Sequence, residues 1–467
     1  MLFRFAFRFL AVITVFVAAA LAVRADTVDD AIKAQMDKQH VPGLSLAVVR
    51  DGRIVKMQGY GRANVELNVP ATPDTVYEIG SITKQFTATA VLMLVEAGKI
   101  GLDDKITQHL TGLPDAWKNV TVRQLLTHTS GIKGYTEAPN FDKLMLQPAT
   151  HETVIQTAAA LPIQFPPGEK WAYSNTGYYL LGLLIEKASG KPYGDFLRER
   201  IFAPLGMTAT QVNDPARVIP KRANGYNWEK DALRNAPAIS MTWPFAAGVL
   251  VSTVADLAKW DAAQNRGRLL KKATWEQMWT PVTLNDKKTA PYGFGWSLDP
   301  VNGHKSIAHG GGIPGFVTYI ARYPDDKLTV IVLTNSDSGD PGRIAQNVAG
   351  LYVPALAPLV LKAIADTEPA VTALVREVNV KMAAGTLDQS LLTPAFWAQI
   401  SPNLKPFGEL LKSLGPLQSV ALLERTEDAK AGTRTYRYRF TYENKTLLMR
   451  ATLTGDNKIA GMQAQPE

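Results

Sequence analysis

The chain has 467 residues, of which 46% are hydrophobic and 20% are charged, which is enough apolar surface for at least one large core and for two domains. This composition excludes a wholly disordered chain, and the lack of cysteine excludes disulfides, thiolate nucleophiles and cysteine metal sites. The formal charge is +8, but no run of five like charges concentrates it, so we expect no nucleic-acid partner.

Residues 1–25 have the pattern of a signal peptide. Arg4 and Arg8 precede an apolar run over residues 9–23, and small residues stand just before Asp26. The alternative is a transmembrane anchor, but this run is shorter than the ~20 residues that cross a bilayer as a helix. We therefore expect cleavage before Asp26, no stable membrane insertion, and a mature protein that is secreted or periplasmic.

The mature chain begins with predicted strands and a buried helix. Residues 44–59 form two apolar runs around Asp51–Gly52, a dipeptide typical of a two-residue hairpin turn. The stretch 81–97 is apolar on nearly every side, so we expect a helix in the interior of the fold. Residues 101–296 mix helical patterns with loops rich in Pro, Gly and Asn, which predicts a mostly helical lobe.

Strands return near the end of this domain. The segments SIAHGGG, GFVTYIARY and KLTVIVLTN lie between residues 305 and 334, with a turn at residues 324–326. A hairpin at the start and this meander near the end predict one antiparallel sheet closed by distant parts of the chain. The predicted fold class is α+β: an antiparallel sheet flanked by helices, with an all-helical lobe.

A second domain is predicted behind a proline-containing linker. The linker is residues 356–369, which separate the domain 26–355 from a small α+β accessory domain, 370–467, in which helices precede strands. The clearest strand of the accessory domain has an aromatic side chain at every second position. We interpret this row as core rather than as a ligand-stacking surface, and its members are Tyr436, Tyr438, Phe440 and Tyr442.

The motif Ser-x-x-Lys occurs twice, at Ser81–Lys84 and at Ser130–Lys133. Only the first opens a predicted helix, because the second is followed by glycines typical of a turn. At i, i+3 spacing the two side chains share one helix face, where an amine can hydrogen-bond a serine hydroxyl and activate it. The alternative is an ordinary helix N-cap with a surface lysine, but a lysine in so apolar a helix needs a partner or a function.

The segment Tyr173-Ser174-Asn175 carries groups that fit the same chemistry. A tyrosine beside a lysine cation can have its pKa lowered from about 10, which would let Tyr173 take or return the proton of the serine. Asn175 is a candidate for binding a substrate amide. The alternative is that this segment is only a turn before a helix.

A glycine-rich strand, His309-Gly310-Gly311-Gly312, supplies the remaining candidates. Glycines at a strand edge, Gly311 among them, let a substrate backbone approach. The main-chain N–H of Gly312 is a candidate to join that of Ser81 in an oxyanion hole. The alternative is that the glycines mark only a bend in the strand.

The order of these segments resembles the serine β-lactamase and penicillin-binding-protein superfamily, nearest the class C enzymes and their esterase and peptidase relatives. The resemblance covers about residues 30–355 and extends to LLTHTSGI, GVLVSTVADLAKW, YGFGW and HGGGIPGF. It implies an antiparallel sheet flanked by a helical lobe, and an acyl-enzyme formed on Ser81. It also implies that Lys84 and Tyr173 exchange the proton and that Asn175 and His309 belong to the second and third motifs.

The third motif departs from the lactamase form, in which Lys-Thr-Gly or Lys-Ser-Gly is usual. His309-Gly310-Gly311 lacks the permanent cation and the hydroxyl, and histidine titrates near ~6.5, so a substrate carboxylate is held less firmly at neutral pH. We therefore expect hydrolysis of small-molecule esters, amides or peptides, of the esterase or D-amino-acid peptidase type, rather than efficient β-lactamase activity. The alternative is a catalytically weak penicillin-binding or peptidoglycan-binding protein.

Other sites are not predicted. GGGIPG matches the dinucleotide pattern but precedes a strand and not a helix, so we expect no nicotinamide site and no other cofactor. The six histidines are scattered, and no metal is predicted. His128 is a possible general base, but the resemblance treats its segment as a structural turn.

Overall fold

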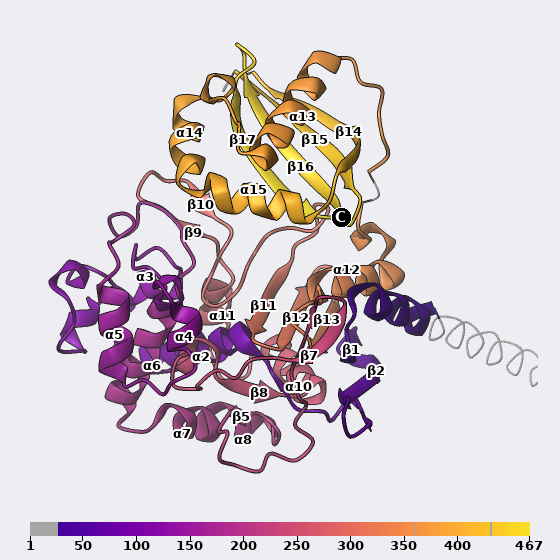
Figure 1. Cartoon of the computed structure of the whole chain (residues 1–467). Helices are drawn as coiled ribbons and strands as arrows, with labels where there is room; N and C mark the ends of the chain where they lie inside the picture. The colour runs from indigo at the N-terminus through magenta and orange to yellow at the C-terminus, as the bar shows by residue number, and fades with distance from the viewer. Residues whose placement is uncertain (1–26, 360, 430–431) are drawn as a thin grey trace, which may run out of the picture. The chain divides into compact units, whose positions relative to one another are not determined.

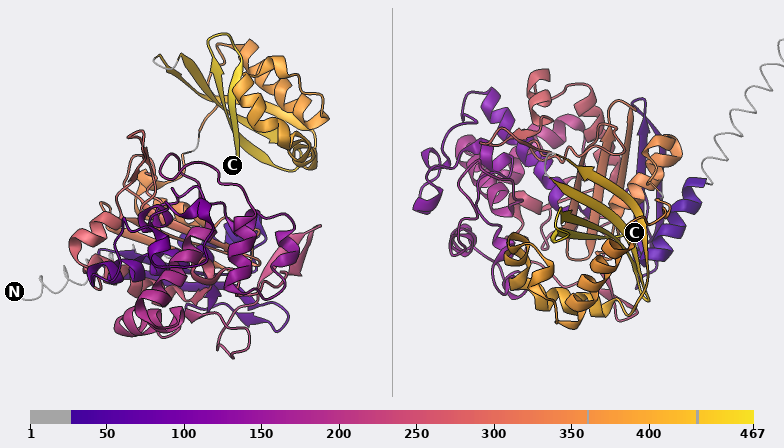
Figure 2. Two further views of the ribbon diagram at one scale, coloured as in Figure 1. Left: turned by 90° about the vertical axis from the view of Figure 1, so that its left-hand side faces the viewer. Right: turned by 90° about the horizontal axis from the view of Figure 1, so that it is seen from above.

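The computed structural model describes residues 27–359, 361–429 and 432–467. The chain forms two compact units, Met1–Pro358 and Leu359–Glu467, shown from three directions in Figures 1 and 2. The division at Pro358 falls within the segment predicted as a linker. The predicted signal peptide, residues 1–25, lies outside the described residues. Within the described ranges, no helix is both long enough and apolar enough to cross a bilayer.

The first unit is built on one antiparallel sheet whose strands come from both ends of the unit. The strand order is β11-β12-β13-β1-β2-β3, and β1 pairs with β13 in the register Leu44↔Thr334. The predicted hairpin and the predicted meander therefore join in a single sheet. Its strands are β1 (Gly43–Arg50), β2 (Arg53–Asn64), β3 (Val69–Pro70), β11 (Ile307–Ile313), β12 (Phe316–Tyr323) and β13 (Leu328–Thr334).

Each face of this sheet is covered by helices. The helix at residues 27–39 and α12 (Pro341–Tyr352) lie against one face of the sheet (Figure 1). Ile32 and Ile344 of these helices are fully buried in the same core as Val332. The opposite face packs against α2 (Thr83–Glu96) and α10 (Val254–Asn265). Alternate strand residues therefore serve two separate cores.

The lobe beside the sheet is mostly helical, as predicted, and α2 runs through its interior. All side chains of α2 from Thr83 to Leu94 are buried, which agrees with its apolar character on every side. The other helices of the lobe are α3 (Val122–Leu126), α4 (Phe141–Leu144), α5 (His151–Ala159), α6 (Asn175–Ser189), α7 (Tyr193–Leu197), α8 (Ala203–Leu205), α9 (Phe245–Gly248) and α11 (Lys272–Met278).

Short strands also occur in the lobe. A three-stranded sheet has the order β4-β8-β5, and two small hairpins pair β6 with β7 and β9 with β10. Their bounds are β4 (Tyr77–Glu78), β5 (Gln211–Val212), β6 (Tyr226–Glu229), β7 (Ala232–Asn235), β8 (Leu250–Ser252), β9 (Val282–Thr283) and β10 (Thr289–Ala290).

In the second unit, helices precede a four-stranded antiparallel meander, as the sequence predicts. The helices are α13 (Pro369–Ala384), α14 (Pro394–Ile400) and α15 (Leu404–Ser413), and the strands are β14 (Leu417–Asp428), β15 (Thr433–Tyr442), β16 (Thr446–Thr454) and β17 (Ile459–Pro466). The predicted aromatic row of β15 is buried in the core of this unit. At one end of the row, the Tyr442 hydroxyl donates to Asn379 Oδ1 on α13 at 2.9 Å.

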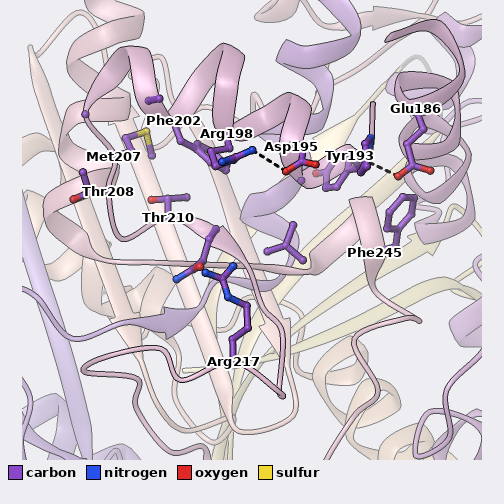
Figure 3. A pocket seen from close by; sticks show the side chains of 16 residues that line it. Glu186, Tyr193, Asp195, Arg198, Phe202, Met207, Thr208, Thr210, Arg217 and Phe245 are labelled. Carbon is purple, nitrogen blue, oxygen red and sulfur yellow. Dashed lines mark hydrogen bonds and ion pairs between the residues drawn. The ribbon is translucent and has the colours of Figure 1, made fainter. Parts of the chain in front are cut away.

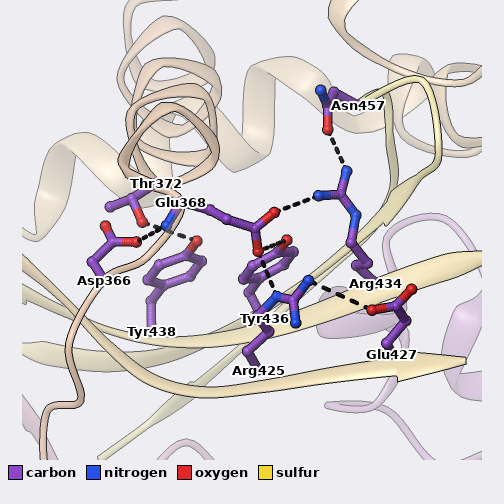
Figure 4. A network of polar contacts seen from close by, with 9 residues as sticks. All are labelled: Asp366, Glu368, Thr372, Arg425, Glu427, Arg434, Tyr436, Tyr438 and Asn457. Atoms are coloured by element: carbon purple, nitrogen blue, oxygen red, sulfur yellow. Dashed lines mark hydrogen bonds and ion pairs between the residues drawn. The ribbon is translucent and has the colours of Figure 1, made fainter.

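A network of ion pairs and hydrogen bonds holds the start of α13 against the sheet of this unit (Figure 4). The Glu368 carboxylate, one residue before the helix, accepts hydrogen bonds from Arg434 at 2.6 Å and from the Tyr436 hydroxyl at 2.8 Å. It also pairs with Arg425. Three strand residues therefore converge on one carboxylate, which anchors the chain where it enters this unit.

Candidate active site

Ser81 lies in a tight turn at the start of α2. The turn is the 3₁₀ segment η1 (Gly80–Ile82), in which Gly80 has φ +49°, a conformation that favours glycine. The residue before it, Ile79, is held by two hydrogen bonds: its N–H donates to the Leu250 carbonyl at 3.0 Å, and its carbonyl accepts from Thr318 Oγ1 at 3.0 Å. The serine is thus placed by contacts to β8 and β12.

The Lys84 amine is fully buried one turn further along. Its Nζ atom lies 3.0 Å from Ser81 Oγ, 2.8 Å from Asn175 Oδ1 and 2.8 Å from the Ala247 carbonyl oxygen. These partners come from η1, α6 and α9, three elements that are far apart in the sequence. The structure therefore brings together the predicted residues Ser81, Lys84 and Asn175.

Among the described residues no anion balances the charge of Lys84, because its partners are a hydroxyl, an amide oxygen and a main-chain carbonyl. Burial consequently lowers the pKa of Lys84 well below its usual value. A neutral amine has two N–H bonds and one lone pair. If Asn175 and Ala247 accept the two N–H bonds, the lone pair faces the Ser81 hydroxyl, as a general base requires.

Tyr173 lies beside the serine, immediately before Ser174, the N-cap of α6. Its phenol is close enough to the Ser81 side chain for that side chain to affect its pKa, and Lys84 Nζ lies 4.7 Å from the centre of its ring. Ser174 caps the helix by accepting from the Gly177 N–H at 3.3 Å, which fixes the segment.

The expected lowering of the Tyr173 pKa is wrong. Burial raises its pKa above the usual value, and the hydrogen bond to Ser81 offsets only part of this effect. The prediction assumed a charged lysine beside the phenol, whereas the buried Lys84 amine favours its neutral form. Tyr173 therefore rests as a protonated phenol, a group suited to donating a proton.

Strand β11 lies at the edge of the main sheet with its outer side toward Ser81. Pro314 and Gly315 form the turn to β12, so Ile313 and Phe316 are the closing hydrogen-bonded pair. By alternation, the main-chain groups of Gly310 and Gly312 point away from β12, toward the open edge.

The three glycines of this strand have different surroundings. A Cβ on Gly311 would lie 1.9 Å from the Ile79 carbonyl oxygen, whereas a Cβ on Gly312 would have no atom within 4 Å. We predicted that Gly311 lets a substrate backbone approach. Its lack of a side chain instead lets β11 approach the serine turn, so the role of Gly311 is in packing. A Cβ on Gly80 would lie 2.8 Å from Gly312 N, so that N–H lies next to the serine turn, where an oxyanion hole requires it.

His309 is buried, and both of its ring nitrogens have protein partners. Nδ1 lies 2.6 Å from the Gly310 carbonyl oxygen and Nε2 lies 2.9 Å from the Tyr292 hydroxyl, which fits an Nδ1–H donor and an Nε2 acceptor. Burial is the main cause that lowers the pKa of His309 to about 4. The imidazole is consequently neutral at pH 7 and is a weaker anion ligand than the sequence suggested.

The two rejected candidates take part in local structure. His128 is buried, its Nδ1 accepts from the Ser174 N–H at 3.1 Å, and its ring lies 4.3 Å from that of Tyr173, so it supports the Tyr173 segment. In the second Ser-x-x-Lys, the Ser130 hydroxyl accepts from the Ile132 N–H at 3.2 Å, and Lys133 pairs with Glu137 at 3.8 Å. Within the described ranges, no group of three His, Asp or Glu residues is placed to hold a metal ion.

Comparison with known proteins agrees with this geometry. The model of the beta-lactamase family matches residues 28–353, which include the sheet, the lobe and the site just described. The chain belongs to the beta-lactamase family. Because the proteins of this fold that it matches include hydrolases and amidases, this family member is a β-lactamase-related serine hydrolase.

Two curated relatives match the first unit of this family member. Penicillin-binding protein 4* of Bacillus subtilis is 34% identical over 320 residues, which cover 64% of this chain and 69% of the relative. Unguisins hydrolase ungD' of Aspergillus campestris is 31% identical over 334 residues, which cover 66% of this chain and 61% of the relative.

Solved structures extend the similarity. The octameric penicillin-binding protein homologue from Pyrococcus abyssi matches with a TM-score of 0.65 and 25% identity, over 95% of this chain and 96% of that chain. D-amino acid amidase from Ochrobactrum anthropi SV3 matches with a TM-score of 0.61 and 29% identity, over 70% of this chain and 98% of that one. The match to the Pyrococcus abyssi protein includes the second unit. The match to the amidase covers a share of this chain close to the share that the family model matches.

Sequence reasoning missed several residues around the site of this family member. Ala247 contributes a main-chain oxygen, Tyr292 hydrogen-bonds His309, and Trp171 packs on Tyr292 with 5.8 Å between ring centres. A signal existed for Tyr292, because it begins the YGFGW segment that supports the family resemblance. No sequence signal pointed to Ala247, because its contact is made by a main-chain carbonyl, which every residue type has.

A cavity elsewhere in this lobe is lined by none of the predicted catalytic residues. Its volume is about 720 Å³, and its wall includes Tyr193 and Phe245 (Figure 3). The Tyr193 hydroxyl lies 2.7 Å from Thr87 Oγ1, which in turn donates to the Ala246 carbonyl at 2.7 Å. The cavity is therefore separated from Lys84 by the α9 backbone.

Proposed function

We propose that the protein is an exported serine hydrolase that cleaves ester or amide bonds through an acyl-enzyme on Ser81, and is of the esterase or D-amino-acid amidase or peptidase type. The observation that carries this proposal is the position of the Lys84 amine. It is buried without an anionic partner and lies 3.0 Å from Ser81 Oγ, so its neutral form can remove the serine proton at neutral pH.

The proposed acylation step uses the groups described above. The Ser81 hydroxyl gives its proton to Lys84 while Oγ bonds to the substrate carbonyl carbon, and the N–H groups of Ser81 and Gly312 stabilise the developing oxyanion. As the bond to the leaving group breaks, Tyr173 donates its phenol proton to that group and recovers one from the Lys84 ammonium. Water then attacks the carbonyl carbon of the ester on Ser81, and its proton passes through Tyr173 to Lys84. Lys84 returns a proton to Ser81 Oγ as the ester bond breaks and the acyl group leaves as an acid.

The electrostatics of the site support an amide or ester substrate over a penicillin. A neutral His309 with both ring nitrogens occupied provides no cation for a substrate carboxylate at pH 7. The amidase relative acts, by its name, on D-amino acid amides, and a substrate of that kind needs no carboxylate ligand.

The export part of the proposal depends on residues 1–25. Their basic start and apolar run support cleavage by a signal peptidase before Asp26. N-terminal sequencing of the protein recovered from outside the cytoplasm tests this, and the expected first residue is Asp26. Recovery of the uncleaved chain from the cytoplasm would contradict it.

The catalytic part is tested with a serine-reactive phosphonate and an activated ester. We expect mass spectrometry to find the phosphonate on the peptide that contains Ser81, and ester turnover to disappear in Ser81→Ala. Labelling at Ser81 without turnover of any ester or amide would instead favour a weakly catalytic penicillin-binding protein. Labelling at another serine would exclude both.

A further inference from the structure

A second cavity is bounded by Tyr173, His309 and Gly310 of the proposed site. Its volume is about 490 Å³, and its wall is largely aromatic, with Trp171, Tyr173, Tyr292 and Tyr319. Among the described residues that line it, Asp299 carries the one charge present at neutral pH, because burial keeps His309 neutral. This cavity therefore combines aromatic surfaces with a single negative charge.

The cavity lies on the leaving-group side of the proposed reaction. Tyr173, the proposed proton donor to the leaving group, forms part of its wall. Gly310, which also lines it, is two residues before Gly312 on the open edge of β11, or about 7 Å along an extended strand. A substrate whose carbonyl lies between Ser81 and Gly312 thus directs its departing portion into this space.

The cavity ends a short distance beyond Gly310. Ala308, the next residue on the same edge of β11, exchanges two main-chain hydrogen bonds with Ser297, at 2.8 and 2.9 Å. That bridge occupies the edge where a longer substrate would continue. A departing portion that follows the strand edge is therefore limited to a short group.

Asp299 stands at this closed end. The Ser297 hydroxyl donates to its carboxylate at 2.8 Å, which orients the group, and the side chain is exposed. In the described part of the chain, no lysine or arginine forms an ion pair with it. A carboxylate beside aromatic rings favours an ammonium group and disfavours a second carboxylate.

We propose that this cavity is the leaving-group subsite, and that Asp299 makes it select a short leaving amine that carries a cationic group over one that carries a carboxylate. The inference rests on the proposed function and adds a substrate class to it. This preference for a cationic leaving amine is opposite to that of a third motif with a permanent cation, which would favour a carboxylate. Asp299 acts here as a specificity-determining residue and takes no part in bond breaking.

The test uses three amides of D-phenylalanine that differ only in the leaving amine: 1,2-diaminoethane, propylamine and glycine. Release of D-phenylalanine by the full-length protein gives kcat/KM for each at pH 7. We expect the cationic amide to exceed the neutral one about three- to tenfold, and the carboxylate-bearing amide to be the slowest. In Asp299→Asn the preference should shrink to about twofold or less.

Asp325→Asn is the matched control, because Asp325 is an exposed aspartate in the turn after β12 and should leave all three values unchanged. Equal rates on the three amides, or an unchanged preference in Asp299→Asn, would overturn the inference and leave the proposed function intact. Failure to cleave any of the three, with Ser81 unlabelled by the phosphonate, would remove the proposed function and the inference together.

Discussion

The Lys84 amine lies 2.8 Å from the main-chain oxygen of Ala247, a residue that belongs to the short helix α9. A carbonyl group on a packed helix cannot ionise or rotate away, so it fixes one N–H bond of the amine in every protonation state. The side-chain oxygen of Asn175 accepts a second N–H bond of the amine. The remaining direction at nitrogen is the one that faces Ser81, which gives the lysine a defined orientation before any substrate binds.

Replacing this amine should remove catalysis without removing the fold. In Lys84→Met we expect kcat/KM on an activated ester to fall by about 10²- to 10⁴-fold, the usual contribution of a positioned general base. The melting temperature should not fall, because methionine fills the buried space without an amine to desolvate. Lys133→Met, in the second Ser-x-x-Lys, is the control and should stay within about twofold of the wild type. A similar loss in both variants would contradict the assignment of Lys84.

A charge placed beside Lys84 should move the pH profile in a defined direction. Asn175→Asp puts a carboxylate in contact with the amine and raises the pKa of Lys84. Because the neutral amine is the active form, the rise of kcat/KM with pH should move to higher pH by about 1–2 units, and activity at pH 7 should fall. Asn175→Ala is the comparison, since it removes the hydrogen bond without adding charge. Undiminished activity at pH 7 in Asn175→Asp, with the alkaline limb of the profile moved to higher pH, would show that Lys84 acts as a cation.

The two neighbouring glycines of β11 should respond differently to the same added methyl group. Gly311→Ala brings a Cβ 1.9 Å from the Ile79 carbonyl and 2.5 Å from Thr318 Oγ1, so the strand or the serine turn must shift. We expect a fall in melting temperature of at least about 5 °C and a loss of phosphonate labelling at Ser81. Gly312→Ala meets no atom within 4 Å and should melt within about 2 °C of the wild type. Equal stability of the two variants would contradict the close approach.

The main sheet could be predicted from the sequence because its signals are local. Asp51 and Gly52 have φ values of 50° and 72°, as expected for a hairpin turn that needs two positive φ angles. The buried helix was recognisable because residues 81–97 are apolar on nearly every side. The second Ser-x-x-Lys could be set aside for a similarly local reason, the glycines that follow Ser130.

The protonation states of the site could not be predicted in this way. The pKa of Tyr173 depends on burial and on the charge of Lys84, and the charge of Lys84 depends on the kind of atoms contributed by α6 and α9. These elements follow Lys84 by 91 and 163 positions, and one of them offers only a backbone oxygen. For the same reason, the packing role of Gly311 could not be separated from a substrate contact until Ile79 was placed beside it.

Glu78 provides a test of stability that is independent of catalysis. It lies on β4, two residues before Gly80, and pairs in register with Val251. Burial raises its pKa to about 7, and a hydrogen bond with Asn213 and the charge of Arg222 offset part of this effect. The folded protein therefore binds a proton at Glu78 more tightly than the unfolded chain does, whose glutamates titrate near ~4.3.

The sign of the pH effect follows from that difference. The stabilisation contributed by protonated Glu78 is complete below about pH 4 and is lost as the pH rises to about 7, because burying the charged form costs free energy. Glu78→Gln cannot ionise, so it should match the wild type near pH 4 and exceed its stability at pH 8 by about 3–4 kcal/mol. That corresponds to a melting temperature higher by about 6–16 °C.

The measurement is thermal unfolding from pH 4 to pH 8 for the wild type, Glu78→Gln and Glu169→Gln. Glu169 is an exposed glutamate in the loop before Tyr173, and its replacement should leave the pH dependence of the wild type unchanged. A stability gain for Glu78→Gln that is the same at pH 4 and pH 8 would mean that the wild-type carboxyl does not titrate in this range. The side chain would then have to be ionised throughout, with the Arg222 charge outweighing its burial.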